Sequence, residues 1–280
     1  MGAWIGDVGG LVEVRCASDV AMSRPDQWVT TEALDGTVAA QLLPRRRRSW
    51  QVGIGTARPE QLGTLAMVPA RTGAGLWFYD ELALVSNMLT PEASLTEPGQ
   101  FSAGSVQGPE AGVFDGADGH RPLSRVVHTS PTAAVIAPVG VTHPVLGVVT
   151  CAVPQDRPVT VSVYLTPWEG RAGVLRVEEL DMRGTVIATW GSQTAGATAL
   201  QRVHRTIRTG MTTVALRVSV REALAWASPA VTMTDTLMPW AEGRGARQVV
   251  IHRPSDQVQR AATSLWDRRS TADYMVQEVG

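Results

Sequence analysis

The run Val159-Thr160-Val161-Ser162-Val163-Tyr164-Leu165 places an apolar residue at every second position. This period of two is typical of a β-strand that turns one face to the core. Further runs of the same kind occupy residues 11–16, 51–54, 175–178, 185–190, 213–220 and 230–234, whereas helical spacing is limited to 58–67 and 257–266. The sequence therefore predicts a mainly β fold.

The spacing of these runs also predicts how the chain is divided. Prolines and glycines gather after residue 90, and short strands then recur up to residue 251, which is the pattern of a β-sandwich or jelly roll. We expect a β-rich domain at 1–90, a sandwich domain at 91–251 and a C-terminal arm at 252–280. The arm has few apolar residues, so we expect it to become ordered only against a partner.

Composition narrows the classes of function. The 280 residues carry 25 cationic and 26 acidic side chains, so a basic surface for sequence-specific nucleic-acid binding is not expected. All cations are arginine, a bias that a GC-rich genome would produce. No apolar run approaches the ~18 residues of a membrane helix, and the first ten residues do not resemble a signal peptide. With only Cys16 and Cys151, a disulfide framework is not expected either.

No catalytic or metal-binding motif is present. The five histidines lack ligand spacing, and there is no nucleophile elbow, P-loop or dinucleotide fingerprint. The densest acidic cluster is Glu178, Glu179 and Asp181. Paired carboxylates of this kind hydrolyse glycans, but this cluster adjoins a hairpin turn and fits a solvated strand edge better. We therefore expect no enzymatic activity and no cofactor.

Residues 112–120, GVFDGADGH, form the most site-like loop. Asp115 and Asp118 could offer oxygen ligands to a structural Ca²⁺ ion. Their spacing does not match an EF-hand, and Asp-Gly pairs are also ordinary turn formers. A surface turn is therefore the favoured interpretation, with Ca²⁺ as the alternative.

Trp168 is the best candidate for a sugar platform. It lies in Thr166-Pro167-Trp168-Glu169-Gly170, a loop sequence, and an exposed indole can stack on the apolar face of a pyranose ring. Trp190, by contrast, lies on an alternating strand and fits the core. The alternative is that Trp168 binds no sugar.

Four consecutive arginines, Arg45, Arg46, Arg47 and Arg48, precede a strand-like segment. They could contact nucleic acid or an acidic partner subunit. On a strand, however, alternate side chains point to opposite faces, so one continuous basic stripe is not expected. Ion pairs between subunits or a solvated face are the favoured interpretations.

Two pairs of segments carry a family resemblance. Residues 76–80 (LWFYD) precede 87–94 (NMLTPEAS), and residues 238–245 (MPWAEGRG) precede 248–251 (QVVI). In this order they resemble minor tail proteins of long-tailed bacteriophages that infect actinobacteria. The resemblance extends over about residues 40–251. It implies an N-terminal unit similar to the ring-forming domain of distal tail proteins, followed by a galactose-binding-like jelly roll.

The resemblance implies a structural role without catalytic residues. The expected partners are other copies in a six-fold ring, the tail tube and the tail-tip hub proteins, with host glycan as a possible ligand. The protein would be assembled in the host cytoplasm and carried in the virion tail. The aromatic residues expected at the ring interface, or in the core of that unit, are Trp4, Trp28, Trp50, Trp77 and Phe78. A freestanding carbohydrate-binding module is the alternative function.

Overall fold

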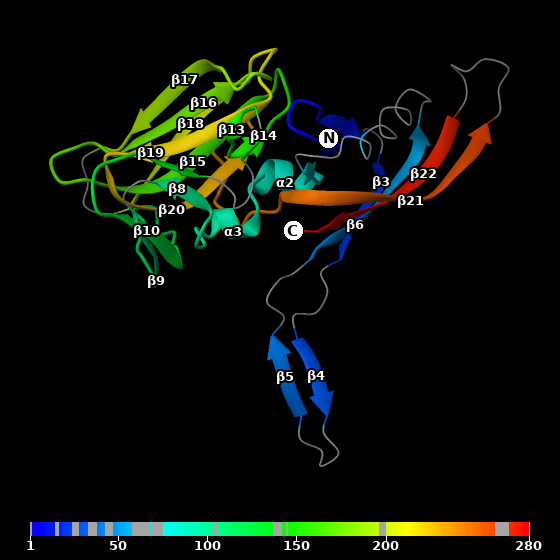
Figure 1. The fold of residues 1–280 in the computed structure, drawn as a ribbon, viewed down its shortest axis with the longest axis horizontal. Helices are drawn as coiled ribbons and strands as arrows, with labels where there is room; N and C mark the ends of the chain where they lie inside the picture. The colour runs from blue at the N-terminus through cyan, green and yellow to red at the C-terminus, as the bar shows by residue number, and fades with distance from the viewer. Residues whose placement is uncertain are drawn as a thin grey trace. The chain divides into compact units, whose positions relative to one another are not determined.

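The computed structural model of the chain describes residues 2–14, 17–23, 28–32, 38–42, 47–57, 68, 75–103, 106–136, 142–143, 145–195, 200–260 and 269–279. These residues are mainly β-strands, as the sequence predicts (Figure 1). No helix among them is both long and apolar enough to cross a membrane. The predicted helix at 58–67 lies outside the described residues, and residues 257–260 belong to a strand.

The chain forms two compact units that are not consecutive in sequence. Unit 1 combines Ala3–Glu13 with Thr72–Ala246, and unit 2 combines Val14–Arg71 with Arg247–Gly280. This grouping differs from the boundaries at 90 and 251 that the sequence suggests, because C-terminal residues pair with strands near the N-terminus.

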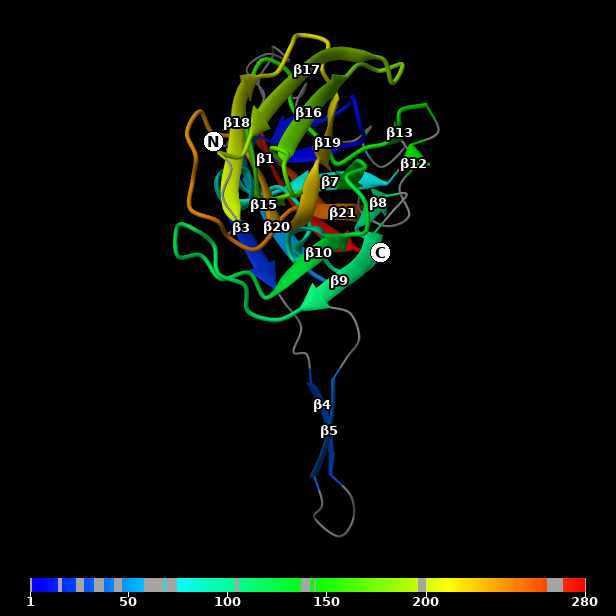
Figure 2. The ribbon, with the colours of Figure 1, turned by 90° about the vertical axis from the view of Figure 1, so that its left-hand side faces the viewer.

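Unit 1 contains a β-sandwich, as expected from the spacing of the strands. Sheet I has the order β18-β15-β20-β10-β9, and sheet II has the order β17-β16-β19-β11-β8, with β14 also paired to β19. Figure 2 shows β16 beside β17 and β15 beside β20. The bounds are β8 Phe101–Ala103, β9 Val106–Ala111, β10 Ser124–His128, β11 Ala134–Ile136, β14 Cys151–Ala152, β15 Pro158–Pro167, β16 Val174–Leu180, β17 Val186–Gln193, β18 Gln201–Arg208, β19 Ala215–Arg221 and β20 Ala223–Thr232.

Smaller elements complete unit 1. Strand β1 pairs antiparallel with β7, and β12 pairs with β13. Two short helices follow β7, and each has its N-terminus capped by a side chain: Asp80 accepts from Ala83 N–H, and Thr90 accepts from Ala93 N–H. The bounds are β1 Ala3–Gly6, β2 Val12–Val14, β7 Leu76–Tyr79, α2 Glu81–Ser86, α3 Pro91–Ser94, β12 Thr142–His143 and β13 Gly147–Val148.

The run that predicts the fold forms the centre of sheet I. In β15, Val159, Val161 and Val163 point into the core between the sheets. The alternate residues Ser162 and Tyr164 are also buried, because other segments cover the second face of the strand. Periodicity therefore places the strand correctly but does not reveal that both of its faces are covered.

Unit 2 contains the strands β21, β22, β6 and β3, which neighbour one another in that order. The C-terminal strand β22 pairs with both β21 and β6, so the expected arm is an interior strand of this sheet. Strands β4 and β5 form a two-stranded ribbon (Figures 1 and 2). The bounds are β3 Ala17–Ser23, β4 Trp28–Glu32, β5 Val38–Leu42, β6 Ser49–Ala57, β21 Ala246–Arg260 and β22 Arg269–Glu278.

One segment from each pair that carries the family resemblance, 87–94 and 238–245, meets the other inside unit 1. The side chain of Asn87 donates to Pro229 O and Ala241 O and accepts from the N–H groups of Leu89 and Val231. The backbone of Gly245 approaches so closely that a Cβ there would lie 1.9 Å from Met88 O. The glycines of the second segment are thus required by the packing of the first.

We expect Gly245→Ala to destabilise the protein by about 1–3 kcal/mol, because the added methyl group must displace the backbone at Met88. Gly191→Ala is the matched control, since the nearest atom to its Cβ would be 3.8 Å away. Urea denaturation compares the two variants with the wild type. Equal urea midpoints for the two variants would contradict the close approach between Gly245 and the backbone of Met88.

Candidate functional site

The site-like loop 112–120 packs on the outer face of sheet I through its last residues. The Tyr164 hydroxyl, on β15, donates a 2.7 Å hydrogen bond to Asp118 Oδ2. The backbone N–H of His120 donates to Asp118 Oδ1 at 3.2 Å. Gly116 N–H and His120 O close the loop at 2.8 Å. The loop is therefore fixed to the strand by its aspartate.

An aromatic cluster forms above this contact. The His120 ring lies between Tyr164 and Trp240, with centroid distances of 4.8 Å and 4.7 Å. Its Nε2 atom lies 3.1 Å from Ser228 Oγ on β20. The guanidinium of Arg202, on β18, lies over the Tyr164 ring at 5.6 Å. We call His120, Tyr164 and Trp240 the aromatic cluster.

Burial and hydrogen bonds set the charges of these groups. Partial burial opposes ionisation of Asp118, but the hydrogen bonds from Tyr164 and His120 outweigh it and hold the pKa of Asp118 below its ordinary value. Burial, and then the bond to Asp118, raise the pKa of Tyr164. Burial lowers the pKa of His120, Asp118 opposes this shift, and Arg202 adds to it. At neutral pH, Asp118 is thus a carboxylate, whereas Tyr164 and His120 of the aromatic cluster are neutral.

The two aspartates proposed as Ca²⁺ ligands have different partners. Asp118 is bound to Tyr164, whereas Asp115 is exposed and pairs with Arg121 at 3.1 Å. The part of the chain that the structure describes holds no group of three or more His, Cys, Asp or Glu side chains placed to bind a metal ion. Ca²⁺ binding by Asp115 and Asp118 stays a prediction.

Trp168 belongs to a different loop, directly after β15. Its N–H donates to Glu222 O at 2.8 Å, and its carbonyl accepts from Arg171 N–H at 2.9 Å. The side chains of Arg171 and Glu222 form an ion pair of 2.6 Å beside it. The side chain of Trp168 is partly exposed. A partly exposed indole flanked by charged hydrogen-bonding groups suits a sugar ring.

The two glutamates of the acidic cluster do not lie on the solvated edge that the sequence suggested, because both are buried. Glu179 is 2% exposed and accepts hydrogen bonds from Trp190 Nε1 at 2.7 Å, Gly210 N–H at 2.9 Å and Thr213 Oγ1 at 2.5 Å. Asp181 accepts from two backbone N–H groups of its own turn. The expectation fails because residues from other strands supply partners that local spacing does not reveal.

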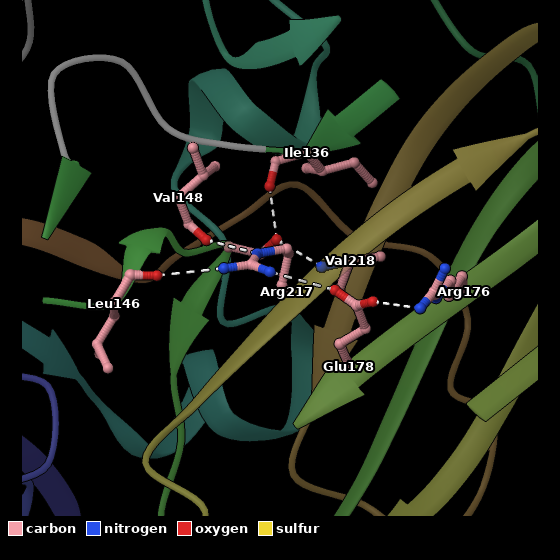
Figure 3. A network of polar contacts seen from close by, with 8 residues as sticks. Ile136, Leu146, Val148, Arg176, Glu178, Arg217 and Val218 are labelled. Carbon is pink, nitrogen blue, oxygen red and sulfur yellow. Dashed lines mark hydrogen bonds and ion pairs between the residues drawn. The ribbon is translucent and has the colours of Figure 1, made fainter. Parts of the chain in front are cut away.

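Glu178 belongs to a separate polar network on sheet II (Figure 3). It lies 2.6 Å from Arg176 and 3.4 Å from Arg217. Arg217 also donates to Val148 O and Leu146 O. The network therefore ties the segment around β13 to β16 and β19, and its contacts are those of a structural ion-pair network.

The residues proposed for an assembly interface are mostly buried. Trp4, Trp77 and Phe78 in unit 1 and Trp50 in unit 2 belong to the core, the second of the two locations expected for them. The Trp28 side chain lies outside the described residues, as do Arg45 and Arg46.

The other two arginines of the run differ from each other. Arg47 is exposed. Arg48 is buried, and its guanidinium forms hydrogen bonds of 3.0 Å and 2.9 Å with Glu278 of β22. Arg48 thus forms an ion pair within the chain rather than lying on a solvated face.

Sequence reasoning selected loop 112–120 but missed the residues that it contacts: Tyr164, Arg202, Ser228 and Trp240. The available signal was Tyr164, an aromatic residue at a position of β15 opposite to the core-facing valines. Its contact with Asp118 joins residues 46 apart, which no local pattern predicts.

Comparisons with known proteins find no matching family model and no matching curated protein. Among solved structures, tailspike protein 4 of bacteriophage CBA120 (its enzymatically active domain) matches at TM-score 0.40 and 9% identity, over 53% of this chain and 21% of the other. N-terminal modules of a Clostridium thermocellum endo-1,4-β-D-xylanase, complexed with xylohexaose, match at TM-score 0.33 and 14% identity, over 56% of this chain and 30% of the other. An exo-β-agarase matches at TM-score 0.33 and 12% identity, over 56% of this chain and 26% of the other. At these TM-scores the matches assign no function to this chain.

We expect Glu179→Gln to lower the free energy of unfolding by about 1–3 kcal/mol, because an amide NH₂ would face N–H and O–H donors. Glu169→Gln, at an exposed position, is the control. Chemical denaturation of both variants is the measurement. A neutral effect of Glu179→Gln would show that its three donors have other partners available.

Acidification should destabilise the protein in part through His120. A histidine whose folded-state pKa is lowered binds fewer protons than in the unfolded chain, so stability falls as pH drops below about 6.5. Between pH 7 and pH 5, we expect His120→Gln to lose less stability than the wild type. The control is His204→Gln, at an exposed position, which should lose as much stability as the wild type. Parallel pH profiles for all three would exclude His120 as a source of the acid sensitivity.

Proposed function

We propose that this chain is a non-enzymatic structural subunit of a phage tail tip, of the distal-tail or minor-tail kind, which assembles with copies of itself in a ring between tail tube and tip complex. The observation that carries the proposal is the ribbon in unit 2. Among the described strands, β4 and β5 pair only with each other. A two-stranded hairpin alone is marginally stable in water, so a partner chain is the natural source of its stability.

Unit 1 supports the structural part of the proposal. The segments that carry the family resemblance meet at Asn87, Gly243 and Gly245, where they hold unit 1 together. The two glutamates of the densest acidic cluster, Glu178 and Glu179, are buried and hydrogen-bonded rather than open to a substrate. Both observations suit a structural protein, in which polar side chains stabilise the packing.

Carbohydrate binding at Trp168 is the second candidate function. The specific observation in its favour is the rigid setting of this loop, in which Glu222 O and Arg171 N–H fix the backbone on either side of the indole. The adjacent ion pair between Arg171 and Glu222 offers both donors and acceptors to sugar hydroxyls. A tail-tip subunit could carry this activity as well, so the two functions are compatible.

We expect the full chain to form a discrete oligomer near six copies, by analogy with the ring that the resemblance implies. Light scattering coupled to size-exclusion chromatography at several concentrations measures this. Replacing residues 28–42 with a short Gly-Ser linker should give monomers, and Trp168→Ala should leave the oligomer intact. A wild-type chain that stays monomeric and is absent from virion tails would overturn the proposal.

For the second function, we expect saturable binding to a cell-wall glycan that is lost in Trp168→Ala and retained, more weakly, in Trp168→Phe, which keeps an aromatic face. A glycan array followed by calorimetry measures the binding. Equal binding by the wild type and Trp168→Ala would remove Trp168 from the site, and no binding by the wild type would reject the function.

A further inference from the structure

The sandwich of unit 1 has four edge strands. Sheet I ends at β18 and β9, and sheet II ends at β17 and β8. An edge strand presents unpaired backbone N–H and C=O groups, so it can pair with a strand of another chain. Soluble proteins commonly prevent this with charges, prolines, bulges or very short edge strands.

Three of the four edges carry such protection. Strand β8 has only three residues. Strand β9 contains Gly108-Pro109 and a register shift where it faces the end of β10. Strand β18 carries four basic residues, Arg202, His204, Arg205 and Arg208.

Strand β17 has a register shift against β16 at Ile187, but it lacks the other features. Its eight residues, VIATWGSQ, include no charged residue and no proline. Among the described strands it pairs only with β16. Val186 and Ile187, at its start, are 40% and 42% exposed. A long, uncharged and partly apolar edge beside three protected ones is the mark of a pairing site.

We propose that the β17 edge receives a strand of the β4–β5 ribbon from a second copy of this chain. This inference rests on the proposed function and states where the ring contact forms. The ribbon strands have five residues each and could lie within the eight of β17. Glu32 is the only charged residue among those ten. Because β17 has no charged residue, this single carboxylate meets no like charge on the edge strand.

A contact of this kind can build a ring. Each copy offers one ribbon and one open edge, so the contact is head-to-tail, and repeated head-to-tail contacts close into a ring when the rotation permits. Backbone hydrogen bonds between the added strand and β17 supply the attraction, as in other cases of strand addition. The basic residues on β18 explain why the ribbon selects the edge of sheet II rather than the neighbouring edge of sheet I.

Cross-linking between two differently labelled chains tests the contact. One chain carries Thr30→Cys on β4 and the other carries Thr189→Cys on β17, both with Cys16→Ser. Cys151 is retained because it is buried and its thiol pKa is raised to about 12. Under mild oxidation we expect a mixed disulfide dimer. The pair Thr30→Cys with His204→Cys, on the protected edge β18, should give none.

Thr189→Lys tests the same contact without a cross-link. Thr189 is exposed, so the variant should keep the wild-type melting temperature and lose the oligomer, whereas His204→Lys should keep both. An oligomer that survives Thr189→Lys and gives no mixed disulfide would overturn the inference and leave the ring proposal standing. Self-cross-linking of Thr30→Cys alone, with no mixed dimer, would also overturn it. A wild-type chain that never assembles would reject both.

Discussion

The buried amide of Asn87, the only asparagine of the chain, is the contact on which unit 1 depends. An amide side chain has two N–H donors and an oxygen with two lone pairs, and all four find backbone partners at 3.0–3.2 Å. The partners belong to the segment after α2, to β20 and to the segment after β20. An apolar side chain at this position would leave four backbone groups without their partner in the interior, where each unsatisfied group costs about 1–3 kcal/mol.

The same contact positions the aromatic cluster. Asn87 holds the carbonyl of Ala241, which is the residue after Trp240. Ser94 Oγ accepts a 2.8 Å hydrogen bond from Gly243 N–H, so the segment directly after Trp240 is fixed at two points. Trp240 can then cover His120, and His120 in turn lies against Tyr164. A polar contact in the interior thus determines the covering of the outer face of sheet I.

Local pattern predicted the strands but not their surroundings. The alternation at 159–165, 175–178 and 213–220 correctly predicts β15, β16 and most of β19, because a half-buried strand imposes a period of two on its own residues. It does not report what covers the other face. The hydrogen-bond partners of Glu179 come from β17 and from the turn before β19. Local spacing does not reveal these partners, so the sequence around the hairpin predicts exposed carboxylates. The pairing of β22 with β6, across more than 200 residues, leaves no local signal at all.

The interleaving of the two units has a consequence during synthesis. Unit 1 is built almost wholly from one continuous stretch, Thr72–Ala246, whereas β6 of unit 2 waits for β22 at Arg269–Glu278. Domains generally fold as units while the chain leaves the ribosome, so the sandwich can form first although it is encoded second. The sheet beside the ribbon is completed only when the C-terminal strand emerges. A nascent chain would therefore expose the β17 edge before its own unit 2 is complete. Association between copies through the ribbon would then wait until translation is nearly over.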